Sequence, residues 1–211
     1  VKKMSNIQNK SFELSLLLSI PASFGLILAS EEIVNALFGY GSFSKEDVKL
    51  TADALKYFGY GVPAFALVKI LSNFFFARDN TKTPFYISIG IVIINISISV
   101  SLFSSIGFII IPIATSIATW FGVLFYIHLL NQKKFLLLNM QLIPNFLKIL
   151  TSTIIMGLIL VFTLNNFADY LDYTYKFKVV YLLLIVGLTG VIYLLSCYLF
   201  GILKIKNYKT N

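Results

Sequence analysis

The hydrophobic positions of this sequence fall into long runs, which short polar segments rich in Lys, Asp, Asn and Gly separate. A helix needs about 20 apolar residues to cross a bilayer, and six runs are close to that length. A membrane β-barrel would instead show segments of about ten residues with alternating polarity, and this sequence has no such alternation. The pattern predicts an all-α integral membrane protein with six transmembrane helices. The predicted helices cover Leu14 to Phe38, Tyr57 to Ala77, Phe85 to Ile106, Ile109 to Leu130, Ile149 to Phe167 and Val179 to Leu203.

The composition agrees with this prediction. Hydrophobic residues make up 58% of the 211 positions and charged residues 12%, whereas soluble domains have about 45–50% and about 25%. The mean hydropathy is +0.86. Pro21, Pro63 and Pro112 each lie inside a predicted helix, where proline removes a backbone hydrogen bond and bends the chain.

Residues with catalytic potential are scarce. Cys197 is the single cysteine and His128 the single histidine, so the sequence offers no disulfide and no Cys/His metal site. It also has no Gly-x-Ser-x-Gly turn and no phosphate-cradling loop. We therefore expect a protein that is not an enzyme and that needs no cofactor, with a monovalent cation as the one exception considered below.

The net charge of +8 reports membrane topology. The basic residues lie at helix ends and no soluble basic domain is present, so we expect no nucleic-acid partner. Eleven basic residues fall on the side of the two chain ends and five on the other, which places both termini in the cytoplasm by the positive-inside rule. The first group is Lys2, Lys3, Lys10, Arg78, Lys82, Lys133, Lys134, Lys148, Lys204, Lys206 and Lys209, and the second is Lys45, Lys49, Lys56, Lys176 and Lys178.

Lys69 stands inside an apolar run. A lysine at the centre of a membrane helix costs roughly 2.5–3.5 kcal/mol. The predicted helix end at Ala77 is about 12 Å away along the axis, further than the side chain reaches comfortably. The fragment has no intramembrane carboxylate to pair with it. We therefore expect Lys69 to face a protein cavity, where it meets water, a helix from outside this chain or a phosphate-bearing substrate.

Hydroxyl and amide side chains gather in the third and fourth predicted helices. Asn95 and Ser99 share one helix face, and Thr115 lies in the next helix. Two interpretations stay open for these residues. They form hydrogen bonds between helices, or they supply oxygen ligands to a small cation near Pro112.

The segment "ARDNTKTP" joins the second and third predicted helices. Arg78 and Lys82 are expected to hold it on the cytoplasmic side, and Asp79 or Asn80 to cap a helix end. Pro84 begins the next helix at a position that tolerates proline. The expected role is structural, with an intracellular gate contact as a further option.

The stretch "LFGYGSFSKEDVKLTADALKYFGYGVPAFALVKILSNFFFARDNTKTP", residues 37–84, resembles the MviN/MurJ family of lipid II flippases within the MOP exporter superfamily. The shared features are an LFxxGxF turn, a Thr-x-x-Ala-Leu segment, a helix with a Val-Lys pair, and a final Arg-x-Asp loop that ends in Thr-Pro. The resemblance implies a fourteen-helix protein with two lobes, of which this chain provides the last six helices. On this basis Val1 is a mid-chain start and the N-terminal lobe is missing.

The resemblance also implies a division of the chain. Residues 1–148 would form four helices of the second lobe and a cytoplasmic linker, and residues 149–211 two appended helices with a groove for a lipid tail. The flippase would move undecaprenyl-linked peptidoglycan precursor across the bacterial inner membrane by alternating access. Its partners would be lipid II, the missing lobe and membrane lipids.

The family's motifs extend to some of the residues singled out above. Lys69 matches the Val-Lys position and so becomes a substrate-cavity candidate. Asn95 and Thr115 occupy the places of a proposed cation site, while Ser99 stands where an acidic residue is expected.

Alternatives remain open at this point. One is another MOP-superfamily exporter, either a polysaccharide-lipid flippase or a drug/cation antiporter. The others are a non-transporting envelope scaffold and a truncated gene product.

Overall fold

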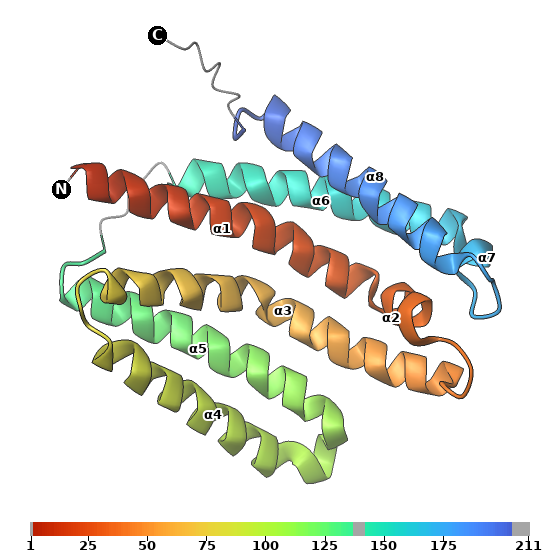
Figure 1. Cartoon of the computed structure of the whole chain (residues 1–211), viewed down its shortest axis with the longest axis horizontal. Helices are drawn as coiled ribbons and strands as arrows, with labels where there is room; N and C mark the ends of the chain where they lie inside the picture. The colour runs from red at the N-terminus through yellow and green to blue at the C-terminus, as the bar shows by residue number, and fades with distance from the viewer. Residues whose placement is uncertain (1, 137–141, 204–211) are drawn as a thin grey trace.

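The computed structural model describes residues 2–136 and 142–203, and these residues are almost entirely helical (Figure 1). The elements are α1 (Lys2–Leu28), α2 (Ser30–Phe38), α3 (Lys45–Phe76), α4 (Lys82–Ile106), the short 3₁₀ helix η1 (Gly107–Ile109), α5 (Ile110–Gln132), α6 (Leu142–Asn166), α7 (Ala168–Leu171) and α8 (Lys178–Leu199). The predicted all-α class is confirmed.

The long helices form a row in which each packs on the next, in the order α4, α5, α3, α1, α6 and α8 (Figure 1). The centre of the row is held by side chains of α1, α3 and α5 that share one buried cluster, including Phe12, Leu71, Phe75 and Tyr126. The helix axes run roughly side by side, so the protein has two ends along them. The start of α1 and the end of α8 lie at one of these ends, and α2 and α7 lie at the other. An even number of crossings explains this arrangement.

Five helical stretches among the described residues are long and apolar enough to cross a membrane. These are Met4–Leu28, Lys45–Phe76, Lys82–Gln132, Leu142–Asn166 and Lys178–Leu199. The third stretch contains α4 and α5, which double back at η1 and pack side by side, so it passes twice (Figure 1). The described residues therefore provide six helical segments of a length and composition that can cross a membrane.

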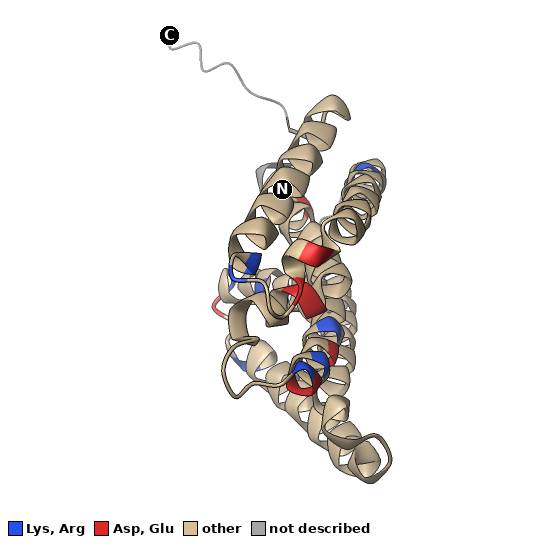
Figure 2. Cartoon of the chain, turned by 90° about the vertical axis from the view of Figure 1, so that its right-hand side faces the viewer, with Lys and Arg blue, Asp and Glu red and all other residues tan. Residues whose placement is uncertain are grey.

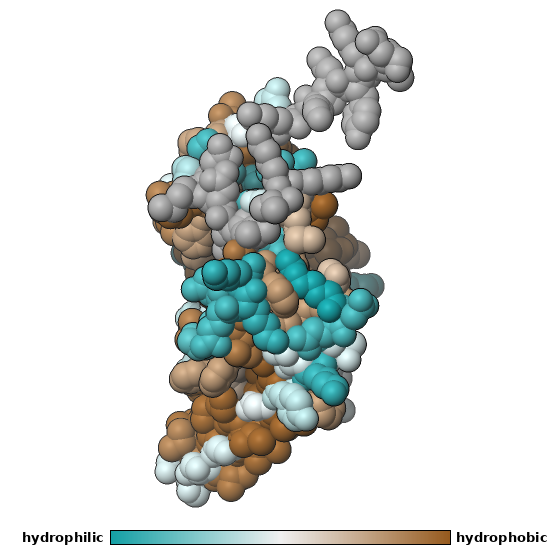
Figure 3. All heavy atoms as spheres, turned by 90° about the vertical axis from the view of Figure 1, so that its left-hand side faces the viewer, coloured by the Kyte–Doolittle hydropathy of each residue, from teal (hydrophilic) through white to brown (hydrophobic). Residues whose placement is uncertain are grey.

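The faces that turn away from neighbouring helices are apolar. Val100 is 73% exposed and Leu199 is 81% exposed, and many other large hydrophobic side chains are also uncovered. Soluble proteins rarely expose apolar surface on this scale, whereas lipid covers it in a membrane. Charged residues gather instead at the end formed by α2, α7 and the start of α3 (Figure 2). Hydrophilic residues also form a patch at the opposite end (Figure 3).

Several predicted boundaries were wrong. The first span is not one helix from Leu14 to Phe38, because the chain bends at Ala29 and the short α2 leads on to pack against α3. α3 begins at Lys45 instead of Tyr57, since Ser44 and Asp47 form a capping box that starts the helix twelve residues earlier.

The last two long helices also differ at their ends. α6 begins at Leu142, so it takes in part of the predicted linker, and α8 ends at Leu199 instead of Leu203. Residues 137–141 of the linker and residues 204–211 of the predicted appended region lie outside the described residues.

The three prolines play two different roles. Pro112 lies in the first turn of α5, where a missing N–H costs nothing, so the prediction of an internal bend there was wrong. Pro21 and Pro63 are internal, and each deprives a carbonyl four residues earlier of its partner. The Leu17 carbonyl accepts the hydroxyl of Tyr193 at 2.7 Å, and the Gly59 carbonyl accepts the hydroxyl of Ser23 at 2.7 Å. Neighbouring helices thus supply the hydrogen bonds that the two carbonyls lose at the proline bends.

Candidate functional site

Lys69 lies on the open side of α3. Leu67 and Leu71 are buried, and Lys69 lies two residues, about 200° around the helix, from each of them. The side chain of Lys69 is exposed, and its ammonium group makes no hydrogen bond or ion pair with any residue that the structure describes. The orientation of Lys69 toward a cavity stays a prediction, since the described residues give its ammonium group no polar partner.

The three cation-site candidates come together between α4 and α5. The Asn95 amide donates a hydrogen bond to the Thr115 hydroxyl at 2.7 Å, and the Ser99 hydroxyl donates to the Asn95 carbonyl oxygen at 3.4 Å. Thr115 in turn donates to the backbone carbonyl of Ile111 at 2.7 Å. Because the Thr115 hydroxyl uses its proton for Ile111, its oxygen can only accept from Asn95. The Asn95 side chain must therefore point its N–H, and not its carbonyl oxygen, toward Thr115. The arrangement is an interhelical hydrogen-bond chain, and because an amide oxygen has two lone pairs, the Asn95 oxygen keeps one beside the hydrogen bond from Ser99.

The α3–α4 connection is anchored by Arg78. Its guanidinium donates to the carbonyl of Phe74 at 2.6 Å and to that of Phe135 at 3.3 Å, and it stacks over the Phe135 ring at 4.3 Å from the centroid. The Phe135 carbonyl also accepts the amide of Gln8 at 2.9 Å. Arg78 thereby ties the end of α3 to the segment after α5. The expected structural role agrees with these contacts.

The other residues of the connection form the turn out of α3 and the start of α4. Asp79 does not cap a helix in this structure but adopts a left-handed backbone with φ of 54°, which turns the chain out of α3. Asn80 does cap, because its side-chain oxygen accepts the N–H of Thr83 at 3.1 Å. Pro84 lies in the first turn of α4, as predicted, and Lys82 beside it is exposed.

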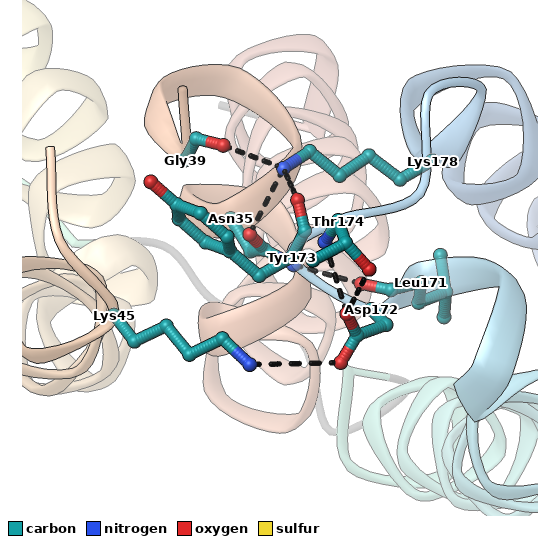
Figure 4. A network of polar contacts seen from close by, with 8 residues as sticks. All are labelled: Asn35, Gly39, Lys45, Leu171, Asp172, Tyr173, Thr174 and Lys178. Atoms are coloured by element: carbon teal, nitrogen blue, oxygen red, sulfur yellow. Dashed lines mark hydrogen bonds and ion pairs between the residues drawn. The ribbon is translucent and has the colours of Figure 1, made fainter. Parts of the chain in front are cut away.

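Sequence analysis missed the most tightly held charge, Lys178 at the start of α8. This side chain is fully buried, and its ammonium group donates to three oxygens (Figure 4). The acceptors are the Gly39 carbonyl at 2.7 Å, the Tyr173 carbonyl at 2.9 Å and the Asn35 side chain at 3.2 Å. The rings of Tyr40 and Tyr173 lie 4.2 and 4.8 Å from the same nitrogen, within the range of cation–π attraction.

This network joins segments that are far apart in sequence. Asn35 belongs to α2 and donates through its amide to the Leu171 carbonyl of α7 at 2.7 Å. Beside it, Asp172 pairs with Lys45 of α3 at 3.8 Å (Figure 4). Hydrogen bonds from the backbone N–H and hydroxyl of Thr174 lower the pKa of the Asp172 carboxyl. The network fastens α7 and α8 to α2, and its only sequence signal is a lysine next to a predicted span.

An apolar groove runs between α1, α6 and α8. Its volume is about 520 Å³, and its lining is almost wholly hydrocarbon. Pro21 and Gly25 contribute from α1, Met156 from α6, and Gly190 and Tyr193 from α8. Gly25 and Gly190 leave space that larger side chains would fill, so the groove has room for a lipid chain.

These features define a multi-pass, all-helical membrane protein. A family model described as "Lipid II flippase MurJ" matches residues 2–204. The chain belongs to this family. The finding favours the flippase interpretation over the alternative of another exporter family.

Individual relatives agree with the family match. The chain is 35% identical to the probable lipid II flippase MurJ of Rickettsia prowazekii over 97% of its own length and 40% of the relative's. It is 27% identical to the corresponding protein of Buchnera aphidicola subsp. Baizongia pistaciae over 99% of its length and 42% of the relative's. The chain thus spans about 40% of the length of the curated relatives it matches.

A solved structure is also similar. It is that of a lipid II flippase MurJ in an inward closed conformation, with a TM-score of 0.76 and 27% sequence identity. The match covers 94% of this chain and 39% of that chain. The similarity therefore extends over the row of helices described above.

Proposed function

We propose that this chain forms part of a lipid II flippase and contributes the second lobe and the appended helix pair. The observation that carries the proposal is the family match over residues 2–204 together with the likeness to a solved flippase over nearly the whole chain. The chain works in transport and not in catalysis. A flippase needs two lobes around its cavity, so activity requires the rest of such a protein.

Lys69 supplies positive charge to the cavity in this proposal. Its ammonium group makes no contact with the described chain and stands on the open face of α3, where the other lobe would meet it. A pyrophosphate headgroup carries charge that is costly to move through hydrocarbon, and a lysine in the cavity offsets part of that cost. The pyrophosphate is the negative partner of Lys69, and it is present only while the substrate is bound. Lys69 therefore stabilises the cavity state that holds the headgroup.

The apolar groove between α1, α6 and α8 holds the polyprenyl tail in this proposal. Its hydrocarbon lining suits an isoprenoid chain, and it lies along the appended helices, residues 149–211 in the predicted division. The headgroup then crosses through the cavity while the tail stays in the apolar layer. The Asn95–Ser99–Thr115 chain between α4 and α5 is proposed as a monovalent-cation site, with the amide and hydroxyl oxygens as ligands.

The proposed location is the bacterial inner membrane with both ends of the chain in the cytoplasm. The excess of basic residues at the end that holds the start of α1 and the end of α8 supports this orientation. Alkaline phosphatase fused after Gln132 is expected to be inactive, and the same enzyme fused after Gly41 to be active. The reverse pattern would contradict the orientation.

A chimera tests the proposed function. Residues 2–204 replace the matching segment of a relative's flippase in a strain depleted of its own flippase, and growth is measured. We expect the chimera to restore growth and to move a labelled lipid II to the outer leaflet. A chimera that is inserted at the parent's level but restores neither growth nor translocation would overturn the proposal.

A further inference from the structure

The segment that joins α6 to α8 is rich in aromatic residues. Residues 167–177 include five aromatic side chains among eleven positions, whereas aromatic residues make up 16% of the whole chain. The short helix α7 lies in this segment, at the end of the protein opposite the start of α1 (Figure 1). A connection that is surrounded by water is usually polar, so this composition indicates a contact that favours aromatic rings.

Five rings at this connection form one cluster. The rings of Tyr170 and Tyr181 are stacked, with centroids 4.7 Å apart and planes 14° apart. Tyr175 meets both of them edge-on, at centroid distances of 5.5 and 5.8 Å. Phe167 packs on Tyr170 at 6.0 Å, and Phe177 packs on Tyr175 at 6.5 Å. These five residues are the aromatic cluster, and their mutual contacts hold the rings in fixed orientations.

The aromatic cluster does not belong to the protein core. Tyr173, the other aromatic residue of the segment, turns inward, and its hydroxyl donates to the Phe43 carbonyl at 2.6 Å. The cluster turns outward, because Phe177 is 57% exposed and Phe167 and Tyr170 are each 41% exposed. Water disfavours exposed phenylalanine rings. The outward position of Phe167 and Phe177 therefore indicates contact with lipid.

The order of the side chains along the segment matches the layers of a membrane surface. Phe167 directly follows α6 and Phe177 directly precedes α8, and both helices are apolar enough to cross a membrane. Tyr170 and Tyr175 lie between them along the chain, and Lys176 is an exposed charge. Tyrosine concentrates where membrane and water meet, because its ring is apolar and its hydroxyl prefers water.

We propose that the aromatic cluster anchors the α6–α8 pair in the lipid–water interface at the α2–α7 end of the protein. Phe167 and Phe177 lie at the border of the hydrocarbon, and Tyr170 and Tyr175 lie in the lipid headgroup layer. Lipid covers the exposed rings, since their surface continues the exposed apolar faces of α6 and α8. The anchor goes beyond the proposed transport function and does not depend on it, because it requires only that both helices span the membrane.

The depth of the cluster is tested by tryptophan fluorescence of the full chain in phosphatidylcholine vesicles. Trp120→Phe removes the single tryptophan, and Phe177→Trp, Leu183→Trp or Glu46→Trp then introduces one reporter. Leu183 is exposed on α8, about 9 Å further along the helix axis than Phe177. Glu46 is an exposed acidic residue in the first turn of α3. The quenchers are lipids brominated near the headgroup, lipids brominated near the chain end, and aqueous iodide.

The three reporters should give three different results. We expect bromine near the headgroup to quench Phe177→Trp more than bromine near the chain end, and Leu183→Trp to show the reverse. Iodide should quench Glu46→Trp, and neither lipid should. If Phe177→Trp instead behaves like Glu46→Trp, the cluster lies in water and is open to a soluble partner, and the proposal is overturned. Stronger quenching of Phe177→Trp by bromine near the chain end would equally contradict a position in the interface.

Anchoring is tested with the Leu183→Trp reporter in place. Phe167→Ser/Phe177→Ser removes both apolar ends of the cluster, whereas the matched control Phe167→Tyr/Phe177→Tyr keeps the rings. In the serine variant the difference between shallow and deep quenching should shrink, because the depth of α8 is no longer fixed, and the control should keep it. The buried thiol of Cys197 should stay unreactive in both variants, so that a smaller difference reports depth and not unfolding. A serine variant that is inserted at the parent level and keeps the full difference would overturn the anchor.

Discussion

Lys69 of α3 and Lys178 of α8 are both lysines on long apolar helices, yet the protein treats them in opposite ways. Lys178 is completely buried and gives its charge to three oxygens and two aromatic rings. Lys69 is exposed and makes no polar side-chain contact with the described chain. The first lysine is committed to holding helices together, and the second is available to a group from outside.

The difference shows what a buried cation requires. Burying a charge without partners costs several kcal/mol, so a lysine in the interior must find acceptors that water would otherwise supply. The α2 segment provides them at Lys178 by bringing Asn35 and the Gly39 carbonyl over the start of α8. Among the described residues, no segment brings acceptors to the Lys69 ammonium group. In the proposed flippase, its acceptors arrive with the other lobe or the substrate.

The largest effect on stability is expected from Lys178→Met. It leaves two buried acceptors and one partly buried acceptor without a donor, and each buried group costs about 1–3 kcal/mol, so the free energy of unfolding should fall by about 3 kcal/mol or more. Thermal unfolding in detergent measures this, with the reactivity of the buried thiol of Cys197 as the probe. Exposed Lys176→Met is the matched control and should change little. An unchanged melting temperature for Lys178→Met would mean that the network contributes nothing.

Gly39→Ala should break the same network without removing the charge. A Cβ at position 39 would clash with the side-chain oxygen and the carbonyl of Asn35, and it would lie 3.1 Å from the Lys178 nitrogen. Overpacking of this kind costs about 1–3 kcal/mol. Gly41→Ala is a poor control because φ is 59° there, so Gly25→Ala, with open space around its Cβ, serves instead. A melting temperature no lower for Gly39→Ala than for Gly25→Ala would contradict the close packing.

Tyr193→Phe gives the scale of a single neutral hydrogen bond. It removes the hydroxyl that satisfies the Leu17 carbonyl at the Pro21 bend, and we expect a loss of about 1 kcal/mol. Pro21→Ala restores a backbone N–H for that carbonyl, so the loss on adding Tyr193→Phe should shrink in the Pro21→Ala background. An undiminished loss in that background would show that the hydroxyl acts through something other than the bend.

Lys69→Met should have the smallest effect on stability. The side chain satisfies no buried group, so we expect the unfolding free energy to stay within about 0.5 kcal/mol of the unmodified chain. The same unfolding assay measures it alongside Lys178→Met. A loss comparable with that of Lys178→Met would erase the contrast between the two lysines.

The sequence predicted the membrane-spanning helices well. An apolar segment of about 20 residues has few conformations other than a helix that satisfy its backbone hydrogen bonds inside a membrane. It also located the α3–α4 connection, where Asn80 caps and Pro84 lies in the first turn. The early start of α3 carried a readable signal in Ser44 and Asp47, which the charged residues after them obscured. The bend at Ala29 also carried a signal, since Ser30, Glu31 and Glu32 interrupt the apolar run directly after it and acidic residues favour the first turn of a helix.

The sites proved harder to predict than the helices. Asn95, Ser99 and Thr115 were brought together as expected because they lie on adjacent helices joined by a short turn. The Lys178 network and the apolar groove combine residues more than a hundred positions apart, and no local pattern encodes which distant carbonyl or wall will be present. A lysine at a helix start therefore looked like an ordinary end charge.

The most direct test of the account is the translocation rate of labelled lipid II in proteoliposomes that contain the chimeric flippase with Lys69→Met. The account predicts normal insertion and thermal stability with a translocation rate at least tenfold lower, since roughly 1.4 kcal/mol of lost attraction for the headgroup is enough for that change. Lys176→Met should translocate at the parent rate. Parent-level translocation by Lys69→Met would contradict the assignment of this lysine to the substrate cavity.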